Sequence, residues 1–111
     1  MAERRQQPRV PSDLTVSIWG YNEKGSRFLQ QIRARNISES GALLVGIEQE
    51  LRCGDLVGVQ YENRQARFKV VWTRNSESAL KIEAAVQKLR ADECPWKRVL
   101  EELAAGSEVR S

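Results

Sequence analysis

The sequence predicts a mainly β protein, a small six-stranded antiparallel β-barrel followed by one C-terminal α-helix. Three observations support this prediction. Apolar and polar residues alternate with a period of two over much of residues 14–84. Short turn signals rich in Gly, Asn and Ser separate the alternating stretches. A helical spacing of apolar residues occurs only after residue 94. At 111 residues, the chain is long enough for one small domain.

The first two expected strands form a hairpin. Leu14, Val16 and Ile18 alternate with Thr15, Ser17 and Trp19, so each set lies on one face of an extended strand. A turn signal at 22–26 contains a glycine, and residues 28–37 alternate again as the second strand.

The remaining strands are shorter. They are expected at residues 42–45, 56–61, 65–74 and 80–84, with turns at 51–55, 62–64 and 75–78. The clearest alternation is in 65–74, where Ala66, Phe68, Val70 and Trp72 are predicted to face inward.

A single helix is expected at the end of the chain. Trp96, Val99, Leu100 and Leu103 have the spacing of one helix face. Pro95 suits a first helical position and Gly106 a stop, and the helix is expected to plug one open end of the barrel. The predicted organisation is an arm at 1–13, the barrel at 14–84, a linker at 85–94, the helix at 95–105 and a tail at 106–111.

The charge of the chain is unevenly distributed. The net charge is +3, and residues 1–35 carry seven Lys and Arg against three Asp and Glu. The rest of the chain is close to balanced. This excess of cations in the first third indicates an anionic partner there.

Composition argues against several functions. The chain has no histidine, which removes the commonest general base and metal ligand at neutral pH. Cys53 and Cys94 are far apart and supply at most two of the four ligands that zinc needs, so no metal site is expected. No nucleophile has an evident base, and the chain is not expected to be an enzyme. No signal peptide or membrane span is recognisable, so a cytoplasmic location is expected.

Two short stretches carry candidate chemistry. The arm contains Arg4, Arg5 and Arg9, and guanidinium groups match the geometry of phosphate and the acceptor edge of guanine. At the end of the second strand, Asn36 and Ser38 are two residues apart and are expected to point the same way and read a base edge. Gly41 is expected to allow a turn with positive φ and close approach of a ligand. Alone, the stretches have ordinary explanations as a solvated terminus and a turn.

The combination of the two stretches resembles the PilZ domain family. Arg5 and Arg9 fit an RxxxR element before the first strand, and Asn36, Ser38 and Gly41 fit (D/N)xSxxG at the end of the second. The resemblance covers residues 4 to about 84. It implies that the domain binds the bacterial second messenger cyclic di-GMP, with the arm folding over the ligand. Arg5 and Arg9 would contact phosphate and guanine, Asn36 and Ser38 would hold a guanine edge, and Gly41 would keep the turn tight. Arg4 extends the element, and its extra charge favours two stacked ligand molecules.

One stretch departs from the family pattern, and two other functions stay open. The last strand of such domains often has a G-x-x-F-like pattern after a tryptophan, whereas residues 79–83 here read Ala-Leu-Lys-Ile-Glu. A protein-interaction module of the same fold without ligand is one alternative. A barrel that binds single-stranded nucleic acid through Trp19, Tyr21 and Tyr61 is another, although we expect these aromatics to fill the interior and expect no nucleic-acid partner. Output would require a downstream protein or self-association as a homodimer.

Overall fold

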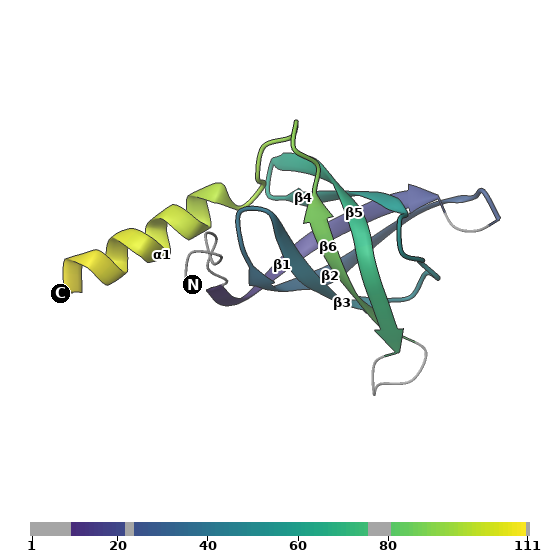
Figure 1. Ribbon diagram of the computed structural model, residues 1–111, viewed down its shortest axis with the longest axis horizontal. Coiled ribbons are helices and arrows are strands. Elements are labelled where there is room, and N and C mark those ends of the chain that lie inside the picture. Colours follow the sequence, from purple (N-terminus) through teal and green to yellow (C-terminus); the bar gives the residue numbers. More distant parts are fainter. Residues whose placement is uncertain (1–9, 22–23, 76–80, 111) are drawn as a thin grey trace, which may run out of the picture.

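Six antiparallel strands form a closed barrel, as predicted (Figure 1). The computed structural model describes the backbone of residues 10–21, 24–75 and 81–110 and, within these ranges, the side chains from 12 to 103. The strands are β1 (Val10–Tyr21), β2 (Arg27–Ile37), β3 (Gly41–Ile47), β4 (Leu56–Tyr61), β5 (Arg64–Asn75) and β6 (Ile82–Lys88), and the helix is α1 (Lys97–Arg110). Their order around the barrel is β1-β2-β3-β6-β5-β4, and β1 closes it by pairing with β4.

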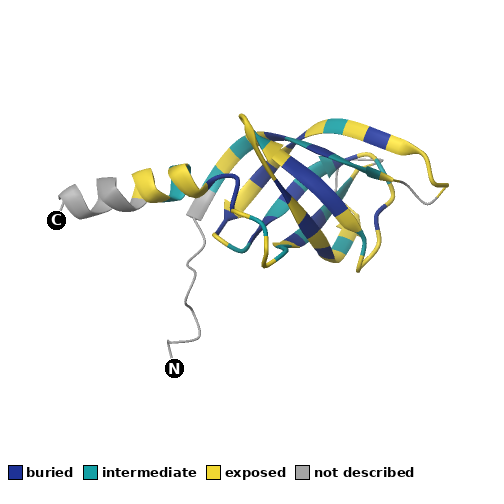
Figure 2. Ribbon diagram, turned by 90° about the horizontal axis from the view of Figure 1, so that it is seen from above, coloured by how far each residue is buried: buried dark blue, intermediate teal, exposed yellow. Residues whose placement is uncertain are grey.

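Alternation along the strands builds one core. On β2, Phe28, Ile32 and Ala34 are buried while the residues between them are exposed or half-buried. Val16 and Ile18 from β1 and Phe68 from β5 meet them inside the barrel. Figure 2 shows the resulting stripes of buried and exposed residues on the ribbon. The predicted period of two is therefore confirmed in these strands.

The first strand begins at Val10, four residues before its expected start. Its register with β2 shifts between the pairs Val10–Ile37 and Asp13–Arg35, so β1 carries one extra residue there. Pro11 lies within this irregularity, and a residue without an N–H is tolerated where a ladder is interrupted. Strand β1 therefore includes, on the far side of the bulge, residues that were expected to be part of the arm.

A second bulge overturns the prediction that Trp72 faces inward. Val70 pairs with Val86 and Trp72 with Ala85, so β5 has one additional residue between these pairs. The extra residue reverses the facing of everything after it. Trp72 is accordingly 41% exposed, and the guanidinium of Arg74 lies over its ring at 5.3 Å from the centroid.

The expectation that the strand aromatics fill the interior also needs correction. Tyr21 is 65% exposed, and Trp19 is half-buried on the outer surface. Both occupy odd positions of β1, whose even positions face inward. Tyr61 is half-buried and packs on the core, while the deeply buried aromatics are Phe68 and Trp96.

The C-terminal part differs from its predicted bounds. β6 ends at Lys88 rather than at residue 84, and Leu80 lies outside the described residues. The helix starts at Lys97 because Pro95 and Trp96 form a turn, after which the N–H of Leu100 donates to the carbonyl of Trp96 at 3.1 Å. It continues through Gly106, since a glycine weakens a helix by about 1 kcal/mol without ending it.

Only the base of the helix closes the barrel. Trp96 is completely buried and its ring lies 5.4 Å from that of Phe68, and Val99 and Leu100 pack on the same core. Beyond this point α1 projects away from the barrel (Figures 1 and 2), and Leu103 is 44% exposed. The predicted plug is thus confirmed for the first turn and wrong for Leu103.

Two further features concern the chain as a whole. Cys53 is exposed and Cys94 is buried, and both are free thiols. Within the described ranges, the structure has no helix with the length and apolar character needed to cross a membrane.

Candidate functional site

The predicted motif lies where β2 ends and β3 begins, in a tight reversal. The N–H of Ser38 donates to the carbonyl of Gly41 at 2.9 Å, and the N–H of Gly41 donates to the Ser38 hydroxyl at 3.1 Å. The carbonyl of Ser40 accepts from the N–H of Lys88 at 2.6 Å, which ties the turn to the end of β6. Two hydrogen bonds therefore hold the shape of the turn, and a third fixes the turn to the end of β6.

Asn36 and Ser38 do not face the same way, contrary to the sequence prediction. Asn36 is exposed, whereas Ser38 is 2% exposed and has its hydroxyl within the turn. The reason is the backbone of Asn36, whose φ is +50°, because a left-handed residue breaks the alternation of an extended strand. Asparagine is one of the residues that adopt this conformation most readily. Asn36 is also opposite the β1 bulge, between the pairs Val10–Ile37 and Asp13–Arg35.

Gly41 is needed for close packing and not for a positive φ. Its φ is outside the left-handed region, in contrast to the prediction. A Cβ at this position would collide with the backbone carbonyl oxygen of Val86 on β6. The glycine therefore lets β3 and β6 approach at the start of their ladder, where Gly41 pairs with Gln87.

The three arginines of the arm, Arg4, Arg5 and Arg9, lie outside the described residues. The structure does describe the point at which the arm joins the barrel. Val10 pairs with Ile37, which lies between Asn36 and Ser38. Arg9 is one peptide bond from Val10. Because consecutive Cα atoms are about 3.8 Å apart, Arg5 begins within roughly 19 Å of the same point. The register of β1 with β2 therefore places the point where the arm joins the barrel beside the motif.

Two more arginines reach the surface beside Asn36. Arg33 and Arg35 face outward on β2, and both approach one carboxylate, that of Asp13, at 2.8 Å and 3.7 Å. Each side chain is 53% exposed. Two guanidinium groups share a single negative charge, so this surface keeps a positive balance. Sequence reasoning did not assign these residues to the site. The alternation of β2 placed Arg33 and Arg35 on the face opposite Ile32 and Ala34, but only the left-handed φ of Asn36 brings its side chain to the same surface.

An unpredicted contact joins the motif to the base of α1. The indole N–H of Trp96 donates to the carbonyl of Ser38 at 2.7 Å, and the thiol of Cys94 lies 4.0 Å from the same oxygen. Burial raises the pKa of the Cys94 thiol, which keeps it neutral. The two residues are 58 positions apart in the sequence, and no local sequence pattern predicts their contact. Trp96 therefore positions the motif from within the core.

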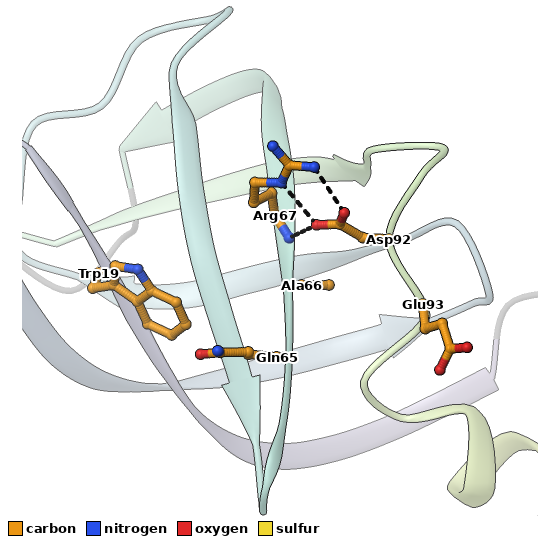
Figure 3. A pocket seen from close by; sticks show the side chains of 6 residues that line it. All are labelled: Trp19, Gln65, Ala66, Arg67, Asp92 and Glu93. Atoms are coloured by element: carbon orange, nitrogen blue, oxygen red, sulfur yellow. Dashed lines mark hydrogen bonds and ion pairs between the residues drawn. The ribbon is translucent and has the colours of Figure 1, made fainter.

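The pocket in Figure 3 is separate from this motif. Its volume is ≈ 500 Å³, and it lies on the outer surface between Trp19, β5 and the loop after β6. Arg67 and Asp92 form a two-pronged ion pair across it, with N–O distances of 3.0 and 2.9 Å. This pair lowers the pKa of Asp92 to about 2. None of Asn36, Ser38 and Gly41 lines the pocket.

The arrangement presents groups of the kinds that recognise ligands. Among the described residues, no group of three His, Cys, Asp or Glu side chains is placed to hold a metal ion. What the site presents is an amide on a left-handed residue, a rigid turn, surface arginines and the attachment point of a basic arm. Such groups suit an anionic, planar ligand.

Comparison with known proteins agrees with the fold described above. No curated protein matches the chain. The model of the PilZ domain matches residues 3–106, nearly the whole sequence, and spans the arm, the barrel and most of α1. The chain belongs to the PilZ domain family.

Proposed function

We propose that this domain is a receptor for cyclic di-GMP that changes conformation on binding and signals to a partner protein. PilZ domains are known receptors for this nucleotide. The observation that carries the proposal is the register of β1 with β2, which attaches the arginine-bearing arm beside the motif at Val10 and Ile37. Both parts of the family motif can therefore reach one ligand.

We assign the residues different parts in recognition. Arg4, Arg5 and Arg9 contact the phosphates and guanine, with planar forks of donors that match both. Asn36, exposed beside the arm, meets a guanine edge. Ser38 and Gly41 act through the shape of the turn, because the Ser38 hydroxyl already accepts from the N–H of Gly41. Each of these assignments can be tested by substituting the residue concerned.

The proposed mechanism is a switch in the arm. Binding neutralises the cations of residues 4–9 and folds the arm onto the rim of the barrel, which creates a new surface for a partner. The contact from Trp96 to Ser38 offers a route by which the same event reaches α1. The domain is in this view an adaptor and not an enzyme. Because PilZ domains are generally cytoplasmic, we propose the same location for it.

Isothermal titration of the purified chain with cyclic di-GMP tests the proposal. GTP and a short single-stranded RNA are the controls. We expect saturable heat with cyclic di-GMP alone and a stoichiometry of two ligands per chain if Arg4 favours a stacked pair. A single ligand per chain would remove the stacked-pair hypothesis. The absence of heat with cyclic di-GMP would overturn the receptor function and favour the ligand-free interaction module.

The variant Asn36→Ala tests whether the Asn36 side chain contacts cyclic di-GMP. We expect roughly three- to tenfold weaker binding, the value of one ordinary hydrogen bond. Asn63→Ala is the matched control, since Asn63 is an exposed turn residue between β4 and β5. Equal affinity in the two variants would remove Asn36 from the ligand site.

A further inference from the structure

Four large apolar side chains gather on the outside of the barrel, away from the motif. Leu29 is 75%, Tyr21 65% and Leu56 55% exposed, and Trp19 is half-buried beside them. We call these four residues the apolar outer face. Contiguous apolar surface of this kind is uncommon on a protein that has no partner for it.

Strand register brings the four residues together. Trp19 on β1 pairs with Leu29 on β2 and with Gly58 on β4. The Trp19 ring covers Gly58 so closely that a Cβ there would collide with it, which fixes the indole flat across β4. Continuing the β1–β4 register by two residues sets Leu56 opposite Tyr21, and the carbonyl oxygen of Leu56 lies close to Gly20.

Cations bracket this surface on both sides. Arg27 on β2 pairs with Tyr21, and Lys69 on β5 pairs with Leu56. Across the four adjacent strands the row therefore reads Arg27, Tyr21, Leu56 and Lys69. Both cations are exposed, and within the described part of the chain neither forms an ion pair. The apolar centre thus has a positive boundary at each end.

The dimensions of the row match one kind of occupant. Four strands about 4.8 Å apart place the two cations roughly 14 Å from each other. A helix rises about 1.5 Å per residue, so this span equals about nine residues, and its turns of about 5.4 Å approximate the strand spacing. A three-turn helix lying across the strands can therefore present apolar side chains to the face and one acidic residue to each cation.

We propose that the apolar outer face docks an amphipathic, acidic helical segment of a partner protein. The proposal does not rest on nucleotide binding, because the two sites are far apart. Val10 lies beside the motif and Trp19 lies in the apolar outer face, and they are nine residues apart on β1, or about 30 Å at 3.3 Å per residue. A second copy of this chain fits less well, since it would bring the same cations against each other. Single-stranded nucleic acid fits less well too, because Leu29 and Leu56 offer no stacking platform and two cations do not follow a phosphate backbone.

Selection from a displayed library of random 16-residue peptides, with the full chain as the target, tests the proposal. The double variant Tyr21→Ser, Leu56→Ser serves for counter-selection, and both side chains are exposed enough to be replaced without disturbing the core. We expect enriched peptides with Leu or Phe at helical spacing and acidic residues about seven or eleven positions apart, because these separations are close to the span and keep both residues on one side of a helix with about 3.6 residues per turn. Amide chemical shifts of the chain should change on β1, β2 and β4 and at Lys69 of β5 when a selected peptide binds.

Fluorescence polarisation of a selected peptide then measures how much each residue of the surface contributes to the affinity for that peptide. The double variant should lose at least about tenfold in affinity, as expected for a central apolar contact. Leu103→Ser, another exposed apolar residue, should change nothing. Lys69→Glu should weaken binding and Lys97→Glu should not. Arg9→Ala should bind the peptide as well as the original chain, so failure of nucleotide binding and failure of docking are distinguishable.

Three results would overturn the proposal. The first is a selection that enriches no acidic amphipathic peptide, or peptides whose shift changes map elsewhere on the barrel. The second is concentration-dependent self-association in sedimentation that the double variant abolishes, which would assign the face to a second copy. The third is a shift map on this face produced by a short poly-uridine strand, which would assign it to nucleic acid.

Discussion

Gly41 illustrates at the residue scale how a motif position can be fixed by packing alone. Replacing it with alanine places a methyl group against the Val86 carbonyl, a backbone atom that can move only with β6. We expect Gly41→Ala to lower the free energy of unfolding by about 1–3 kcal/mol, measured by urea denaturation. Gly20→Ala is the matched control, because its added methyl would lie at or near ordinary contact distance, 3.4 Å from the ring of Phe28 and 3.5 Å from the carbonyl oxygen of Leu56. Equal losses in both variants would contradict this account of Gly41.

Asp92 provides a prediction about acid stability. Its ion pair with Arg67 and the backbone N–H of Arg67 hold its pKa at about 2, below the ordinary 3.8. Because the folded pKa is the lower one, the pair stabilises the fold above about pH 3.8, and this contribution disappears as the pH falls toward 2.

The measurement is the urea midpoint of unfolding between pH 5 and pH 2. Asp92→Asn should remove part of the decline that the original chain shows in the acid range. Glu93→Gln leaves the Arg67–Asp92 pair intact and should keep that decline. An Asp92→Asn profile parallel to that of the original chain would mean that the pair does not contribute.

Helix α1 shows at the scale of elements how the end of the chain supports the motif. Trp96→Phe keeps a ring against Phe68 but leaves the buried Ser38 carbonyl without its indole donor. We expect a loss of roughly 1–3 kcal/mol in stability and faster amide exchange at residues 38–41. Trp72→Phe, which changes an exposed ring, is the control. Unchanged exchange at residues 38–41 would show that Trp96 does not hold the turn.

The elements also show which parts of the structure were predictable. Alternation placed Ala66, Phe68 and Val70 in the core correctly, because burial of one strand face is a local property of the sequence. Trp72 was assigned to the wrong face because a bulge leaves no clear trace in an apolar stretch. The motif was recognised by its residue types, but its geometry depends on the left-handed φ of Asn36.

Contacts between distant segments were the least predictable. The hydrogen bond from Trp96 to Ser38 and the apolar outer face both arise from which strands become neighbours. Sequence spacing gives the face of each strand and not its partners. The same limit applied to α1, where periodicity placed Leu103 on the packed stripe although the helix leaves the barrel before that residue.

At the scale of the whole molecule, most of the cations in the first third of the chain belong to the arm or to the end of β2 that carries the motif. The excess of cations lies in residues 1–35, and the barrel begins at Val10 beside the motif. Among the residues whose side chains the structure describes, the buried hydrophobic core extends from Val16 to Trp96. We expect substitutions in residues 4–9 to test ligand binding with little effect on folding.

The most direct test of the central claim is to measure cyclic di-GMP affinity and melting temperature together for Arg9→Ala. Arg27→Ala is the matched control, an exposed arginine at the opposite end of β2. Loss of one charge-assisted contact is worth about 1.5–3 kcal/mol, which is roughly a ten- to hundredfold loss of affinity. We expect this loss in Arg9→Ala alone, with the melting temperature of both variants unchanged. Unaltered affinity in Arg9→Ala, or affinity lost only in proportion to stability, would contradict the arm as the ligand-binding element.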